Sequence, residues 1–240
     1  MSSLPNSPDI HALWRNAQAV CFDIDSTVCL DEGIDVLAAH AGVGAQVVEM
    51  TKAAMGGAVP FQDALRQRLE LIRPSRSMVA DCLRTHPPRL TPGILDLVNA
   101  LTRRRVAVYL VTGGFTHMAE PVIKRLGLAR TQLIANTLLF TSDGTYAGFD
   151  TSAHTARSGG KGAAISELKN RFGYAPLIMV GDGVTDLEAR PPADGFIGYG
   201  GVVVRERVKA QADWFVLDFR ELQAELDRSP PARRRSSTVG

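Results

Sequence analysis

The sequence predicts an α/β fold: a parallel sheet covered by helices on both sides, with a helical cap inserted into the core. Short apolar runs alternate with helical patterns along most of the chain, which is typical of parallel strands joined by helices. Residues 33–88 break this alternation because they carry helical patterns and no strand. A second interruption, with Asp143-Gly144 between two apolar runs, predicts a small β-hairpin.

Five apolar runs are predicted to form the buried strands, since strands covered on both faces read as continuous apolar stretches. They cover residues 19–22, 106–111, 177–180, 195–198 and 214–217. Two helical patterns lie between them. Thr91 is expected to cap a helix that starts at Pro92 and carries apolar residues through Leu101. The second pattern covers residues 162–172.

The inserted segment is predicted to contain four short helices, which prolines separate or bound. The helices cover residues 34–40, 45–55, 61–72 and 77–85, and the prolines are Pro60, Pro74, Pro87 and Pro88. The hairpin is expected to pair residues 138–140 with residues 146–149.

These boundaries predict two domains and a tail. Residues 1–32 and 89–228 form the expected core domain, residues 33–88 the cap domain, and residues 229–240 a disordered basic tail. The formal net charge is +2, and the three consecutive arginines of the tail account for the whole positive excess. The charge balance therefore gives no reason to expect nucleic acid as a partner.

Cysteine and histidine usage favours a reducing compartment and no zinc site. The three cysteines form no CxxC pair, and the five histidines show no ligand spacing such as HxxxH. No apolar run approaches the length of a membrane span, and residues 1–9 contain no basic residue, so no membrane contact and no secretory signal are expected. The predicted compartment is the cytosol.

Two carboxylates follow the first predicted strand. Asp23 and Asp25 are two residues apart on an extended segment, so they point to the same side of the sheet edge. Because two buried carboxylates repel, one must be protonated or a cation must be present. An alternative is a pair of acids that merely cap the following helix.

Three further polar motifs follow later strands or open helices. Thr112-Gly113-Gly114 provides a hydroxyl and two glycines whose N–H groups can approach a phosphate closely. Lys161 lies between two glycines at a helix start, and Asp182 and Asp186 can bind a hard cation through oxygen. Each motif alone is equally typical of a turn, a solvated lysine or a polar loop, but the four together favour phosphate chemistry.

In this order the motifs resemble the haloacid dehalogenase (HAD) superfamily of phosphatases. The resemblance rests on DxDST at residues 23–27, TGG at 112–114, Lys161, and GDGxxD at 181–186. It implies a Rossmann-like core. Segments of the cap, including residues 32–35 and 54–61, are similar to the phosphoserine phosphatase branch of this superfamily.

The resemblance also implies roles for the core residues. Asp23 is expected to attack phosphorus, and Asp25 to act first as general acid and then as general base. Asp23, Asp182 and the backbone carbonyl of Asp25 are expected to bind Mg²⁺, with Asp186 supporting them through a metal-bound water. The phosphoryl oxygens are expected to contact Thr112, Gly113, Gly114 and Lys161.

The cap is expected to select the substrate, O-phospho-L-serine, a small molecule with one ammonium and one carboxylate. Glu32 and Arg68 are the implied partners of those two groups. The remaining implied substrate contacts are Met55, Gly56, Phe61 and Thr185. The implied reaction is Mg²⁺-dependent hydrolysis to L-serine and phosphate, the last step of serine biosynthesis. Two alternatives stay open: another small phosphate ester, or a catalytically silent regulatory protein. A homodimer stays open as the oligomeric state.

Overall fold

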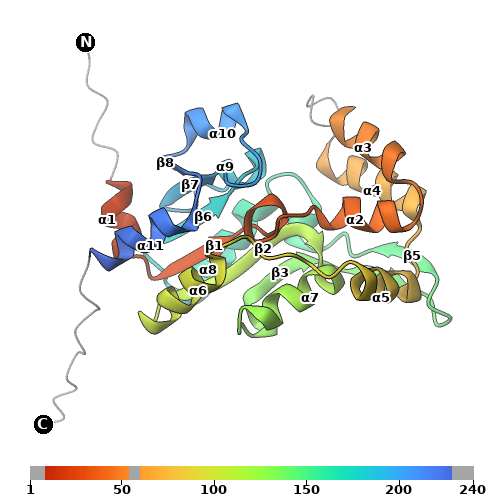
Figure 1. Cartoon of the computed structure of the whole chain (residues 1–240), viewed down its shortest axis with the longest axis horizontal. Helices are drawn as coiled ribbons and strands as arrows, with labels where there is room; N and C mark the ends of the chain where they lie inside the picture. Colours follow the sequence, from red (N-terminus) through yellow and green to blue (C-terminus); the bar gives the residue numbers. More distant parts are fainter. Residues whose placement is uncertain (1–8, 54–59, 229–240) are drawn as a thin grey trace, which may run out of the picture.

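The computed structural model describes residues 9–53 and 60–228, and its main feature is a six-stranded parallel sheet (Figure 1). The strand order is β3-β2-β1-β6-β7-β8. In chain order these strands are β1 (Ala19–Phe22), β2 (Ala107–Phe115), β3 (Leu133–Asn136), β6 (Leu177–Gly181), β7 (Gly195–Tyr199) and β8 (Trp214–Val216). Numbered within this sheet, the order is 3-2-1-4-5-6, that of a doubly wound Rossmann-like fold. The predicted α/β class is therefore confirmed.

Helices cover both faces of the sheet because the strand side chains alternate between two apolar clusters. Val20 and Phe22 of β1 point into one cluster, and Ala19 and Cys21 point into the other. The first cluster is completed by α1 (Ile10–Arg15), α6 (Ile94–Arg103), α7 (Thr116–Arg125) and α11 (Phe219–Asp227). The second is completed by α8 (Gly160–Phe172), α9 (Val184–Leu187) and α10 (Glu206–Gln211).

The structure corrects three details of the predicted core. Strand β3 was not predicted, and it pairs in parallel with β2 at the sheet edge. Strand β2 runs beyond its predicted end, through both glycines of the TGG motif. Thr91 does not cap α6: Gly93 does, with φ +83°, and the hydroxyl of Thr91 instead donates a hydrogen bond to the carbonyl of Thr27.

The described helices α2 to α5 follow the turn after β1 and precede α6, and they lie at one end of the molecule in Figure 1. They are α2 (Gly33–His40), α3 (Gly44–Ala53), α4 (Phe61–Ile72) and α5 (Arg76–Thr85). Their apolar faces form a third buried cluster, separate from the two that flank the sheet. Within the residues that the structure describes, no helix combines the length and the apolar character needed to cross a membrane.

The predicted hairpin is present as the antiparallel pair β4 (Leu138–Phe140) and β5 (Tyr146–Phe149). It joins the helical cluster, into which Leu138 and Phe149 are buried. Arg76, the first residue of α5, donates its backbone N–H to the carbonyl of Gly144 in the hairpin turn at 2.9 Å. Its guanidinium also lies 5.1 Å from the centre of the Phe140 ring. The hairpin therefore supports the inserted helices from the side of the core.

Candidate active site

A tight turn after β1 brings two carboxylates to the carboxyl edge of the sheet. Asp23 continues β1 and donates its N–H to the carbonyl of Val180 in β6 at 2.9 Å. The following residues, Ile24–Val28, coil tightly, and Ser26 has φ +53°. A positive φ is costly for a residue with a side chain, and such residues concentrate at functional sites. Parallel sheets bind ligands at this edge, near the point where the strand order reverses.

Three buried carboxylates and one lysine meet at this edge. Oxygens of Asp23, Asp182 and Asp186 lie within 4.8 Å of one another, and the three residues are 7%, 3% and 0% exposed. The ammonium of Lys161 lies 2.8 Å from Oδ1 of Asp23 and 2.6 Å from Oδ1 of Asp186. Burial opposes the charge of Lys161, but Asp186 and Asp23 outweigh it and raise the pKa of Lys161, which stays protonated.

This cluster fits a hard divalent cation. Apart from its ion pair with Lys161, the buried Oδ1 of Asp23 accepts no well-directed hydrogen bond. Thr27 donates its hydroxyl to Oδ1 of Asp182 at 3.1 Å, which fixes the orientation of that carboxylate. Carboxylate oxygens held this close repel one another, and Mg²⁺ or a similar ion would offset the repulsion.

Burial dominates the electrostatics of the carboxyl groups at the site. Burial is the largest cause and raises the pKa of Asp23, of Asp25 and of Asp186, the last to about 8. Glu32 and Asp23 add to the effect on the pKa of Asp25, which lies well above its ordinary value. A raised pKa favours the protonated carboxyl group, which is the form that can donate a proton to a leaving group.

The TGG motif lies directly beside Asp25. The N–H of Gly114 donates to the hydroxyl of Thr112 at 2.9 Å, and a Cβ at Gly114 would lie 3.1 Å from Oδ2 of Asp25. A Cβ at Gly113 would lie 2.9 Å from the ring of Phe61, the first residue of α4. A side chain at Gly114 would therefore crowd the acid, and one at Gly113 would crowd the ring of Phe61.

Glu32 and Arg68 approach the same edge from the inserted helices. The hydroxyl of Ser26 donates to Oε1 of Glu32 at 2.8 Å, and the next residue, Gly33, donates its N–H to Oδ1 of Asp25 at 2.7 Å. Burial lowers the pKa of Arg68, and the nearby carboxylates of Asp35, Glu32 and Asp25 act against this shift. The guanidinium of Arg68 donates from Nε to the carbonyl of Ala64 at 3.1 Å and from Nη1 to the hydroxyl of Thr51 at 3.4 Å, so both of these hydrogen bonds are to the inserted helices.

The other predicted contacts have mixed outcomes. Thr185 is half-buried in α9, between Asp182 and Asp186 in the chain. Met55 and Gly56 lie outside the described residues. A cavity of about 380 Å³ opens beside Asp25 and is also lined by Gly33, Thr112 and Gly114.

Two residues at the site were not predicted from the sequence. Arg205 donates from Nε to Oδ2 of Asp182 at 2.9 Å, and its guanidinium lies 3.7 Å from Glu32. Asn136, fully buried at the end of β3, donates to the carbonyl of Gly113 at 2.8 Å and orients that peptide. Asn136 follows an apolar run, residues 133–135, that is too short to indicate a strand. Arg205 follows three valines and directly precedes α10, and this local sequence does not indicate a contact with Asp182.

Comparisons with known proteins agree with this geometry. A haloacid dehalogenase-like hydrolase model matches residues 17–194. A phosphoserine phosphatase of Rattus norvegicus is 53% identical over 219 residues, which is 91% of this chain and 97% of that protein. The chain belongs to the phosphoserine phosphatase family of haloacid dehalogenase-like hydrolases. Members of this family generally use a divalent metal, and the acidic cluster provides the oxygens for one.

Solved structures support the same family. A phosphoserine phosphatase described as a phospho-aspartyl intermediate analogue matches with a TM-score of 0.75 and 26% identity, over 87% of this chain and 98% of that one. A structure of DsGPDH from Dunaliella salina matches with a TM-score of 0.81 and 35% identity over 93% of this chain. The match covers only 38% of the DsGPDH chain, which is the longer of the two.

Proposed function

We propose that this protein hydrolyses O-phospho-L-serine to L-serine and phosphate with Mg²⁺, through an aspartyl phosphate on Asp23. The observation that carries the proposal is the buried group of Asp23, Asp182, Asp186 and Lys161 at the sheet edge, with Glu32 held beside it by Ser26 and Arg68 on α4 of the inserted helices. The acids and the lysine can carry out phosphoryl transfer. Glu32 can bind the ammonium of an amino acid and Arg68 its carboxylate.

In the first step, a carboxylate oxygen of Asp23 attacks phosphorus and the bond from phosphorus to the serine oxygen breaks. Asp25 donates its proton to that oxygen, for which its raised pKa suits it. Lys161, the hydroxyl of Thr112 and the N–H groups of the glycine motif receive the phosphoryl oxygens and offset their charge.

In the second step, water attacks the aspartyl phosphate and releases phosphate. Asp25 is now ionised and removes a proton from that water, which restores both residues for the next cycle. The hydrogen bond from the N–H of Gly33 to Oδ1 holds the carboxylate of Asp25 in one orientation during both steps.

Asp23, Asp182 and the backbone carbonyl of Asp25 would hold the Mg²⁺, with Asp186 beside them. When bound, the ion supplies positive charge against the phosphoryl group and the attacking carboxylate. Asp186 accepts hydrogen bonds from Lys161 and, at 2.9 Å, from the N–H of Gly183. Asp186 would therefore hold the lysine and the turn at Gly183 in position.

The substrate serine would lie between a core domain (residues 1–32 and 89–228) and a cap domain (residues 33–88). Arg68 would pair with its carboxylate and Glu32 with its ammonium. Phe61, which already touches Gly113, would cover the phosphate side and exclude water. Thr185, Met55 and Gly56 complete the proposed contacts.

We further propose that the reaction takes place in the cytosol as the last step of serine biosynthesis. The three cysteines are free and buried, which suits a reducing compartment. Imaging of a fluorescent fusion in the source cells tests the location.

A substrate panel tests the proposed function. Phosphate release is measured for phosphoserine, phosphothreonine, phosphotyrosine and glycerol phosphate at equal concentration, with Mg²⁺ present. The proposal expects the highest kcat/KM for phosphoserine. A higher value for any other ester, or no release from any of them, would contradict it.

The metal requirement gives one prediction. We expect no phosphoserine hydrolysis in excess chelator, recovery on adding Mg²⁺, and inhibition by excess Ca²⁺. Mg²⁺ demands near-octahedral geometry at about 2.1 Å, whereas Ca²⁺ takes more oxygens at longer distances. A Ca²⁺ ion that engages both oxygens of Asp23 leaves neither free to attack. Full activity in excess chelator would exclude a metal from the reaction.

The proposed double role of Asp25 gives another prediction. We expect Asp25→Asn to remove phosphoserine hydrolysis but to leave a single rapid burst of nitrophenol from p-nitrophenyl phosphate. Nitrophenolate leaves without a proton, so Asp23 can still be phosphorylated, but without the base the aspartyl phosphate is hydrolysed slowly. Stopped-flow absorbance measures the burst. Equal suppression of the burst and of the steady state would show that Asp25 is needed for attack itself.

A further inference from the structure

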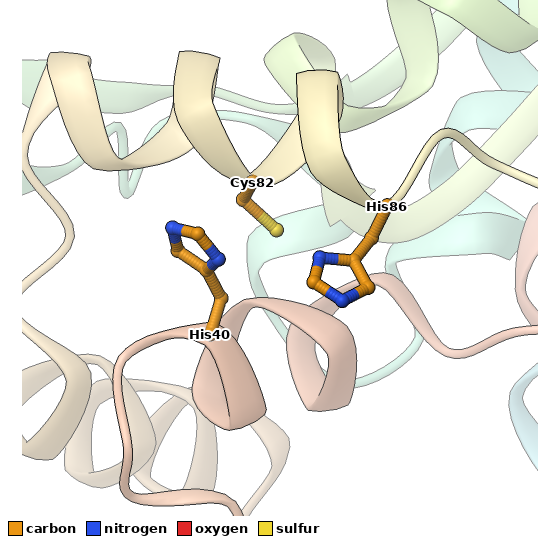
Figure 2. Close-up of side chains that lie close together, drawn as sticks. All are labelled: His40, Cys82 and His86. Atoms are coloured by element: carbon orange, nitrogen blue, oxygen red, sulfur yellow. The ribbon is translucent and has the colours of Figure 1, made fainter.

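Three metal-ligating side chains meet in the inserted helices, outside the catalytic cluster. Donor atoms of His40, Cys82 and His86 all lie within 4.8 Å of one another. Figure 2 shows the two imidazole rings on either side of the thiol, all three directed into the same space. This cluster could not be predicted from the sequence because His40 lies far from Cys82 and His86 in the chain.

Two helices produce this arrangement. His40 is the last residue of α2, whereas Cys82 lies in the last turn of α5 and His86 directly follows it. The N–H of His86 donates to the carbonyl of Cys82 at 2.7 Å, so the helical turn continues to His86 and both side chains share one face. The two imidazole centres are 5.9 Å apart.

The surroundings of the three residues suit metal binding. Nε2 of His40 lies 3.4 Å from Oδ2 of Asp81, and a carboxylate on one ring nitrogen orients the other nitrogen toward a metal. Nδ1 of His86 lies 2.9 Å from the hydroxyl of Thr85. Cys82 is fully buried and His86 is exposed, so the cluster is shielded from solvent at the thiol and open to solvent at His86.

We propose that His40, Cys82 and His86 bind one Zn²⁺ ion that joins α2 to α5. One sulfur and two imidazoles are typical zinc ligands, and water at the exposed side completes a tetrahedron. Zinc bonds of about 2.0–2.3 Å place donor atoms about 3.4–3.7 Å apart, so ring movements of about 1 Å close the site. Binding releases the thiol proton of Cys82 to solvent.

The site is chemically separate from the carboxylate cluster. Mg²⁺ prefers oxygen ligands and dehydrates reluctantly, so it does not compete for a sulfur and two nitrogens. The position of the zinc gives it a structural role. α2 begins at Gly33, whose N–H donates a hydrogen bond to Asp25. α5 ends at Thr85, just before the segment that leads back to α6 in the core. A metal between these helices therefore ties together both connections of the proposed cap.

Cobalt binding in the presence of excess Mg²⁺ tests the proposal, because Mg²⁺ occupies the oxygen ligands first. Metal-free full-length protein is titrated with Co²⁺, and the thiolate-to-cobalt charge-transfer band is recorded. We expect one equivalent to bind with this band and one equivalent of Zn²⁺ to displace it. The variants Cys82→Ala and His86→Gln should lose the band or bind at least about 100-fold more weakly.

Matched controls and a second measurement keep the test decisive. Cys21→Ala removes another buried cysteine, and His154→Gln removes a histidine from outside the cluster, so both should keep the band. In unaltered protein, Zn²⁺ with excess Mg²⁺ should raise the midpoint of thermal unfolding. Absence of the charge-transfer band in unaltered protein, or its persistence in folded Cys82→Ala, would overturn the proposal.

Discussion

Asp23→Asn is expected to lower kcat for phosphoserine by at least about three orders of magnitude while the protein stays folded. Asparagine has nearly the shape of aspartate but is a poor nucleophile, so no aspartyl phosphate forms. The fold should survive, since Asp23 is one of three crowded acids and Lys161 keeps its contact with Asp186. Single-turnover rates and thermal unfolding, measured side by side, separate the two effects.

A control variant shows whether the loss is specific to this site. Asp143→Asn changes an exposed acid in the hairpin turn, far from the carboxylate cluster in the chain, and should leave kcat unchanged. A folded Asp23→Asn protein with normal turnover would show that another group attacks phosphorus.

Arg68→Ala is expected to reduce kcat/KM for phosphoserine by about 30- to 1,000-fold, or about 2–4 kcal/mol. The variant loses the proposed charge-assisted contact with the substrate carboxylate. An aryl phosphate has no such carboxylate, so its hydrolysis should change little. Glu32→Gln should act in the same direction as Arg68→Ala, because it leaves the ammonium of the substrate without its partner.

The ratio of kcat/KM for the two substrates in each variant is the measurement. Arg66→Ala provides a matched control, because Arg66 lies on the same helix but is exposed and paired with Asp63. Equal losses on both substrates would mean that Arg68 holds the inserted helices together. No loss on either would contradict its role in choosing phosphoserine.

The core strands could be predicted from the sequence because each is a continuous apolar run that is buried on both faces. Strand β3 could not be predicted, since its apolar run is short and ends in the polar residue Asn136. The side chain of Asn136 is used for a hydrogen bond to the carbonyl of Gly113, which is distant in the chain. The prediction that Thr91 caps α6 is wrong because its hydroxyl donates a hydrogen bond to the carbonyl of Thr27, 64 residues away in the chain. Long-range hydrogen bonds of this kind leave no local pattern.

The carboxylates and Lys161 could be predicted as a group because each ends a strand or opens a helix at the same sheet edge. Arg205 could not be predicted, because its contacts with Asp182 and Glu32 depend on where the loop between β7 and α10 lies in the folded chain. The cluster of His40, Cys82 and His86 was missed for the same reason, since two helices must pack before its members meet.

Rapid-quench labelling tests the central claim most directly. The protein is mixed with Mg²⁺ and phosphoserine that carries labelled phosphate, stopped in acid at successive times, and digested for mass spectrometry. We expect label on Asp23 before free phosphate accumulates, and no labelled protein with Asp23→Asn. Release of phosphate without any labelled protein, or label on a residue other than Asp23, would contradict the account.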